Sequence, residues 1–238
     1  MKVDYYLYSN CGERSVNQDA VGVCEQNEYI LFALCDGLGG HGGGEIASQT
    51  AVDAIIAAAR TDDENLIDRC MNSADESVLK KTQGDNDLKN MKTTAVLLFV
   101  RGSIAQWAHM GDSRLYYFRK HKYVKRTLDH SIPQTLVAIG EIKESEIRHH
   151  ADRNKLLKCF PSEGKSFEKS EAVNVSKGDS FVLMSDGFWD WIDSKDISKA
   201  LKKNKTAKLA AQQLVDLAFK RGKDKNMDNL SIIIARLN

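Results

Sequence analysis

The order in which strands and helices are predicted along this chain constrains its fold more than any single motif does. Apolar runs typical of strands cover residues 3–9, 20–24 and 29–35, and apolar residues at helical spacing follow over 45–60 and 64–80. Helices therefore arrive as a pair after a block of strands, whereas in a parallel sheet they alternate singly with strands. The order predicts an α+β fold, in which two packed antiparallel β-sheets form a β-sandwich flanked by pairs of α-helices, in α-β-β-α layers.

The second half of the chain is also predicted to have a block of strands followed by a pair of helices. Strand candidates at residues 93–100, 104–109 and 115–118 are separated by short turns that contain glycine, and they predict a meander. A strand, two helices and a closing strand are then predicted at residues 180–185, 194–202, 207–221 and 230–237. Because the sequence has no internal repeat and no Pro/Ser-rich linker, we expect residues 1–238 to form a single domain.

Residues 131–164 interrupt the strands. This segment is polar, contains Pro133 and Gly140, and shows no clear helical or strand period. We expect it to form short helices and to act as a flap beside the functional site, where it would set substrate choice.

Composition argues against several classes of partner. The chain has 34 basic and 33 acidic residues, a net charge of +1, so no overall field attracts nucleic acid or an anionic membrane. No stretch approaches the roughly 20 apolar residues of a membrane span, and the N-terminus lacks the layout of a signal peptide. The five cysteines form no CxxC pair and are odd in number, which favours buried thiols. We expect a cytoplasmic monomer that binds neither nucleic acid nor membrane.

A glycine-rich segment follows the strand at residues 29–34. Asp36 comes at its start, and six of the next eight residues, 37–44, are glycine. A carboxylate at the end of a buried strand, followed by permissive backbone, suits a metal or phosphate site. The spacing Gly37-x-Gly39-x-x-Gly42 also fits a dinucleotide-binding loop, although Asp36 would then lie beside a pyrophosphate and no second strand follows the helix. Dinucleotide binding therefore stays as a remote alternative.

A second Asp-Gly pair strengthens the metal interpretation. Asp186-Gly187 also follows an apolar strand, and Asp19, Asp112 and Asp228 lie beside other predicted strands. Carboxylates without matching histidine or cysteine clusters favour Mg²⁺ or Mn²⁺ over zinc. Two such ions that share a carboxylate activate water for hydrolysis of a phosphoester, and a basic residue is then expected near the phosphate.

Seven short motifs resemble, in order, those of the metal-dependent PPM/PP2C family of serine/threonine protein phosphatases, in its bacterial branch. They are Arg14-x-x-Asn17-Gln18-Asp19, Asp36-Gly37-Leu38-Gly39-Gly40-His41, Thr93-Thr94, Gly111-Asp112-Ser113-Arg114, Thr127-Leu128-Asp129-His130-Ser131, Ser185-Asp186-Gly187 and Asp228-Asn229. The resemblance spans nearly the whole chain, and that family's fold agrees with the predicted sandwich.

The resemblance implies a set of metal ligands. Asp36 would bridge two Mn²⁺ or Mg²⁺ ions, and the Gly37 carbonyl would bind one of them. Asp186 and Asp228 would complete the coordination of the second ion, and Asp19 would bind a metal directly or through water. Asp112 would help to hold a weaker third ion.

The resemblance also implies an activity. Arg14 would bind the substrate phosphate, and a hydroxide bridging the ions at Asp36 would attack phosphorus in line, without a covalent phosphoenzyme. The substrates would be proteins that carry phosphoserine or phosphothreonine, and the enzyme would reverse a cognate Ser/Thr kinase. The alternative is a non-catalytic relative that binds phosphoproteins or senses metal through the same surface.

Two positions depart from the family pattern. Gln18 stands where many relatives have an acidic metal ligand, so we expect the second ion to rely more on water. Leu38 stands where animal members have a histidine proposed as general acid. His41 could replace that histidine, but we expect it to pack near the start of the following helix. We expect His149 and His150 to be solvated and not to bind metal.

Overall fold

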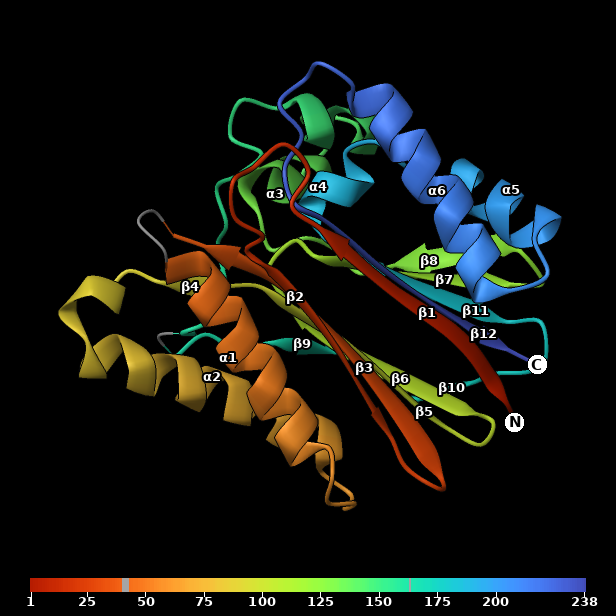
Figure 1. The fold of residues 1–238 in the computed structure, drawn as a ribbon, viewed down its shortest axis with the longest axis horizontal. Helices are drawn as coiled ribbons and strands as arrows, with labels where there is room; N and C mark the ends of the chain where they lie inside the picture. Colours follow the sequence, from red (N-terminus) through yellow and green to blue (C-terminus); the bar gives the residue numbers. More distant parts are fainter. Residues whose placement is uncertain (40–42, 163) are drawn as a thin grey trace.

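The computed structural model describes residues 1–39, 43–162 and 164–238. Its strands form two sheets that lie face to face, with a helix pair outside each sheet (Figure 1). Every strand pair in the described residues is antiparallel. The predicted α+β sandwich is therefore confirmed.

The first sheet joins the two ends of the chain. Its strand order is β1-β12-β11-β7-β8. The bounds are β1 (Val3–Asn10), β12 (Leu230–Leu237), β11 (Ser180–Met184), β7 (Arg114–Arg119) and β8 (Lys122–Arg126). The outer face of this sheet is covered by α5 (Ser194–Lys203) and α6 (Ala207–Gly222), and the single turn α4 (Asp186–Trp189) follows β11 directly.

The second sheet is built around a long central strand. The order is β10-β6-β5-β3-β2, with β4 paired to β3 and β9 paired to β6. The bounds are β2 (Asp19–Glu25), β3 (Tyr29–Leu38), β4 (Lys92–Thr93), β5 (Ala95–Arg101), β6 (Ile104–Met110), β9 (Glu168–Lys169) and β10 (Val173–Asn174). The helices α1 (Gly43–Ala58) and α2 (Leu66–Gly84) cover its outer face, and the 3₁₀ turn η1 (Asn86–Leu88) follows α2.

Alternate residues of the central strands enter different apolar layers. In β3, Leu31 and Ala33 face α1 and α2, whereas Phe32 and Leu34 face the other sheet. Because both faces of the central strands are covered, β3, β5 and β11 are almost continuous apolar runs. In the described part of the chain, no helix has the length and apolar character that crossing a membrane requires.

The structure differs from the predicted elements at the first of the two Asp-Gly pairs. Asp36 was expected to follow its strand, but it lies inside β3, because Gly37 and Leu38 still pair with Thr93 and Lys92 of β4. A two-residue strand such as β4 leaves no apolar signal in the sequence. At the second pair, Asp186 follows β11 as predicted, and it begins the single turn α4.

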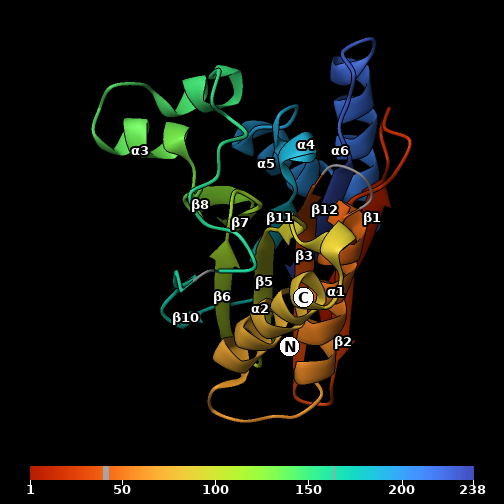
Figure 2. The same ribbon diagram turned by 90° about the vertical axis from the view of Figure 1, so that its left-hand side faces the viewer.

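The segment proposed as a flap projects from the sandwich (Figure 2). It contains α3 (Ile132–Ala138) and the 3₁₀ turn η2 (Glu144–His149), so the predicted short helices are confirmed. The Ser131 side chain caps α3 by accepting from the Gln134 N–H. A single β-bridge between Ser131 and Leu156 joins the two sides of the segment to each other, and another between Thr93 and Phe160 joins the segment to β4.

The layer between the sheets predicts a large cost for truncating Leu34. This side chain is 0% exposed and lies between the two sheets, so Leu34→Ala leaves a cavity and should lower the free energy of unfolding by about 2–5 kcal/mol. The matched control is Leu209→Ala on α6, where the side chain is 55% exposed and a change below about 0.5 kcal/mol is expected. Urea denaturation measures both, and a similar small loss for the two variants would contradict this account of the core.

Candidate metal centre

The predicted site residues gather at one end of the sandwich. A cavity of about 180 Å³ is lined by Asp36, Gly37, Asp112, Asp186 and Asp228. They come from separate parts of both sheets: the end of β3, the β6–β7 turn, the end of β11 and the start of β12. The fold therefore brings together carboxylates from opposite ends of the sequence.

Asp19 lies next to this group on the neighbouring strand. Its Cα is paired with that of Asp36 across β2 and β3. Ser185 donates a hydrogen bond to Asp19 Oδ2 at 2.8 Å, and the Ser231 N–H donates to Ser185 Oγ at 3.0 Å. Asp19 Oδ1 is buried and has no hydrogen-bond partner among the described residues. A buried oxygen of this kind is available to a cation or to water that a cation holds.

The carboxylates disfavour one another's ionised form. Burial raises the pKa of Asp36 well above its usual range, and the charges of Asp19 and Asp186 raise it further. Burial likewise raises the pKa of Asp112 well above its usual range. The pKa of Asp19 rises to about 7 and that of Asp186 to about 6, with burial again the largest cause. A divalent cation at this place would stabilise the ionised carboxylates and so offset these shifts, and the donor set therefore fits hard metal ions.

Gly37 has a steric reason to be glycine. A Cβ atom on Gly37 would lie 2.0 Å from the Gly44 carbonyl oxygen and 2.7 Å from the Gln18 carbonyl oxygen. The Gly37 N–H also donates to the Gln18 carbonyl at 2.9 Å. The start of α1, at Gly44, and the residue before β2, Gln18, thus both contact Gly37 closely. These contacts hold Asp36 close to the start of α1.

Two threonines hold the backbone of Asp36. The Thr94 N–H donates to the Asp36 carbonyl at 2.8 Å, and the Asp36 N–H donates to Thr94 Oγ1 at 3.1 Å. Thr93 Oγ1 donates to the same carbonyl at 2.9 Å. The two threonine hydroxyls therefore position Asp36, a role that the sequence motif did not reveal.

Asn229 fastens the loop that carries Arg14. Its side chain donates to the carbonyls of Cys11 at 3.0 Å and Val16 at 2.9 Å, and it accepts from the Gln18 N–H at 2.8 Å. In the sequence, Asn229 stands out only as the neighbour of Asp228. Its place directly after a predicted ligand was the one signal that could have found it.

Trp189 ends α4 and lies beside the turn that carries Asp112. Its ring is buried, and its indole N–H donates to the Asp112 carbonyl at 3.0 Å. The Arg114 guanidinium lies 3.5 Å from the centre of the same ring. Trp189 therefore positions the turn that carries Asp112.

Arg14 forms an ion pair with one of the predicted ligands. Its Nε lies 3.2 Å from Asp228 Oδ1 and its Nη2 lies 3.0 Å from Asp228 Oδ2. Both side chains are 45% exposed, so this bidentate pair is open to solvent. Arg14 thus lies at the edge of the aspartate cavity, where a predicted phosphate-binding residue should be.

The two departures from the family pattern also lie at this cavity. Gln18 and Leu38 both line it, and Gln18 Nε2 donates to the Gly39 carbonyl at 3.2 Å. The Gln18 side chain therefore contacts the backbone of the glycine segment. His41, considered as a substitute acid, lies outside the described residues.

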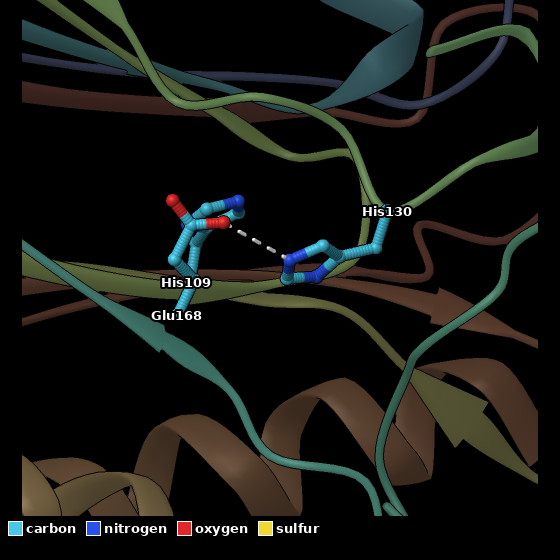
Figure 3. A group of neighbouring side chains, drawn as sticks. All are labelled: His109, His130 and Glu168. Carbon is cyan, nitrogen blue, oxygen red and sulfur yellow. Dashed lines mark ion pairs between the residues drawn. The ribbon is translucent and has the colours of Figure 1, made fainter. Parts of the chain in front are cut away.

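A second cluster, which the sequence did not suggest, lies behind the Asp112 turn. His109, His130 and Glu168 each offer a ligand atom, and these atoms lie within 4.8 Å of one another (Figure 3). However, His130 Nδ1 accepts from the Gly111 N–H at 3.2 Å, so the neutral ring carries its proton on Nε2, which faces Glu168 at 3.5 Å. His130 has no free lone pair for a metal in this arrangement. Its hydrogen bond instead positions the turn next to Asp112.

Comparison with known proteins identifies the family. The family model described as "Protein phosphatase 2C" matches residues 8–230. The chain belongs to the protein phosphatase 2C family. The family that the seven motifs predicted is confirmed, and its two-sheet fold agrees with the structure.

Bacterial members of the protein phosphatase 2C family are similar over nearly all of the chain. The serine/threonine protein phosphatase PstP of Mycobacterium tuberculosis is 29% identical over 93% of this chain, which spans 42% of that protein's length. The serine/threonine phosphatase stp of Listeria monocytogenes is 27% identical over 93% of this chain and 90% of its own length. The catalytic domain of PstP, solved with two manganese ions, has a TM-score of 0.86 at 26% identity and covers 99% of both chains.

The fold also decides against the dinucleotide-binding alternative. That interpretation needs a parallel strand-helix-strand unit after the glycine segment. Instead β3 pairs antiparallel with both β2 and β5, and α1 is followed by α2.

The raised pKa values predict that protons compete with metal ions. With a pKa of about 7, Asp19 holds a proton at pH 6 and is ionised at pH 8, and metal binding needs the ionised form. We expect the apparent Kd for Mn²⁺ to rise about tenfold from pH 8 to pH 6, with proton release on binding. Isothermal titration calorimetry in two buffers measures both quantities.

The control for this experiment is Asp53→Asn, which removes an exposed carboxylate on α1. It should leave the pH dependence unchanged. A Kd that stays constant between pH 8 and pH 6 in the unmodified protein would show that Asp19 does not take part in metal binding as proposed.

Proposed function

We propose that residues 1–238 form a single catalytic domain that hydrolyses phosphoserine and phosphothreonine on proteins, with Mn²⁺ or Mg²⁺ as cofactor. The observation that carries the proposal is the cavity in which mutually repelling carboxylates meet beside Arg14. Such a cavity attracts divalent cations, and cations next to an arginine attract a phosphate group. The similar phosphatases named above support the same activity.

Each carboxylate has a place in this proposal. Asp36 lies among the others and would bridge two ions, with the Gly37 carbonyl on one ion and Asp186 and Asp228 on the other. Asp112 would hold a weaker third ion. When bound, the ions supply an activated water and neutralise charge on the phosphate oxygens.

Arg14 and Asp19 would bind the phosphate and the water. Arg14 would bind the phosphate oxygens through its planar guanidinium, which suits a bidentate contact. Since Arg14 now pairs with Asp228, binding of phosphate and metal would separate the two groups. Asp19, fixed by Ser185, would accept a proton or a hydrogen bond from water in the cavity.

Protonation of the leaving serine or threonine oxygen would come from water. Leu38 has no proton to give, and no histidine is among the described residues that line the aspartate cavity. Gln18 also lines this cavity, but its amide is not an acid.

We expect the enzyme to reverse the action of a Ser/Thr kinase that phosphorylates the same proteins.

Asp36→Asn tests the activity. We expect loss of at least about a hundredfold in kcat for an aryl phosphate with Mn²⁺, because the variant removes the bridging charge and with it several kcal/mol of stabilisation. EDTA should abolish turnover by the unmodified protein, and Asp53→Asn should be fully active. Turnover that is indifferent to EDTA and to Asp36→Asn would refute the proposal. Capture of a phosphopeptide without hydrolysis would support the non-catalytic alternative.

The flap predicts a difference between large and small substrates. Deleting residues 139–143, which connect α3 to η2, should lower kcat/KM for a phosphorylated protein such as casein about tenfold, because the flap would contact the substrate beyond its phosphate. Aryl phosphate turnover should change less than twofold. Equal losses on both substrates would indicate a structural role for this segment.

A further inference from the structure

A second cavity lies directly beside the aspartate cavity. It has a volume of about 160 Å³, and Asp228 lines both cavities. Four Arg or Lys side chains and His149 line it, against two carboxylates: Arg14, Arg148, Arg153 and Lys225, with Asp190 and Asp228. We call it the basic cavity. Its balance of charge contrasts with that of the whole chain, which has a net charge of only +1.

The two carboxylates of the basic cavity already have partners. Asp228 pairs with Arg14, and Asp190 pairs with Arg153. Arg148 and Lys225 form no ion pair with any part of the chain that the structure describes. Two positive charges are therefore left uncompensated within one small cavity, which repels metal ions and attracts an anion.

The backbone around Lys225 has a defined conformation. Its neighbours Asp224 and Asn226 have left-handed backbone, with φ of 62° and 53°, and both are residue types that tolerate it. The Lys225 N–H donates to the Gly222 carbonyl at 3.0 Å, and the ammonium lies 5.4 Å from the centre of the Trp191 ring. These contacts hold Lys225 at the cavity, although its side chain is exposed.

Part of the cavity lining belongs to the flap. Arg148 is in η2, and Arg153 follows it in the same segment. Arg14, which the proposed function assigns to the substrate phosphate, lies on the boundary between the two cavities. A chain bound with one phosphate at Arg14 would thus extend its neighbouring residues past Arg148 and Lys225.

We propose that the basic cavity binds a second anionic group of the phosphoprotein substrate, close in sequence to the residue that is dephosphorylated. This inference rests on the proposed function, since it deepens the substrate class of the same site. Residues one or two positions along an extended peptide lie roughly 3.5–7 Å apart, the scale of neighbouring cavities. The shared chemistry is an anionic oxygen group, and it can come from a second phosphorylated residue or from Asp or Glu.

A second phosphate should bind better than a carboxylate. It carries about −1.5 to −2 charges at pH 7 and three acceptor oxygens, so it can contact Arg148 and Lys225 together. A carboxylate carries one negative charge. The site therefore predicts a ranking of substrates: doubly phosphorylated peptides first, then singly phosphorylated peptides with an adjacent acid, then neutral ones.

The experiment compares three peptides that differ at one position, two residues from a phosphothreonine. This position carries a non-hydrolysable phosphonate analogue of phosphoserine, a glutamate or an alanine. In the unmodified protein with Mn²⁺, we expect KM to be about tenfold lower for the phosphonate peptide than for the alanine peptide, with glutamate between them. Arg148→Gln combined with Lys225→Gln should remove this difference and leave turnover of the alanine peptide and of an aryl phosphate unchanged.

The matched control is Lys2→Gln, which removes one positive charge at the other end of the sandwich. Lys2 precedes Val3, which pairs with Leu237, whereas Asp228 precedes the opposite end of β12, roughly 25 Å away. It should keep the ranking of peptides. Equal KM values for the three peptides in the unmodified protein, or an unchanged ranking in the double variant, would overturn the inference. Absence of aryl phosphate turnover would instead overturn the proposed function.

Discussion

The repulsion among buried carboxylates at one end of the sandwich is the interaction on which the rest of the site depends. Burial raises the pKa values of Asp19, Asp36, Asp112 and Asp186, and the charges of neighbouring carboxylates raise them further. Such an arrangement costs stability in the absence of cations. Divalent ions that bind only the folded state relieve this repulsion and so stabilise the fold.

The sandwich keeps these carboxylates together by attaching each to a different strand end. The backbone of Asp36 is held by Thr94, Asp19 is held through Ser185, and the Asp112 turn is held by Trp189. Each of these bonds joins segments that are distant in sequence. The strands themselves are fixed by apolar layers on both faces, so the carboxylates lie on strands or within two residues of a strand end.

The basic cavity lies beside the aspartate cavity, and the flap contributes to its lining. Arg14 pairs with Asp228 at the border, and Arg148 and Lys225 lie beyond it. Opposite charges in adjacent cavities suit a substrate whose phosphate must approach metal ions while the rest of the peptide remains anionic. Because the flap lines part of the basic cavity, the projecting segment and the catalytic end of the sandwich would act on the same ligand.

The sequence by itself determined the sandwich, the helix pairs and the identity of the acidic residues. Apolar runs and their spacing depend only on residues close together in the sequence, and the seven motifs can be recognised by their order. It could not reveal that β4 extends β3 past Asp36, that Asn229 fastens the Arg14 loop, or that His130 supports the Asp112 turn. The tertiary structure decided these contacts because they join residues far apart in sequence. Their hydrogen bonds and ion pairs form only once the packed sheets have brought those residues together.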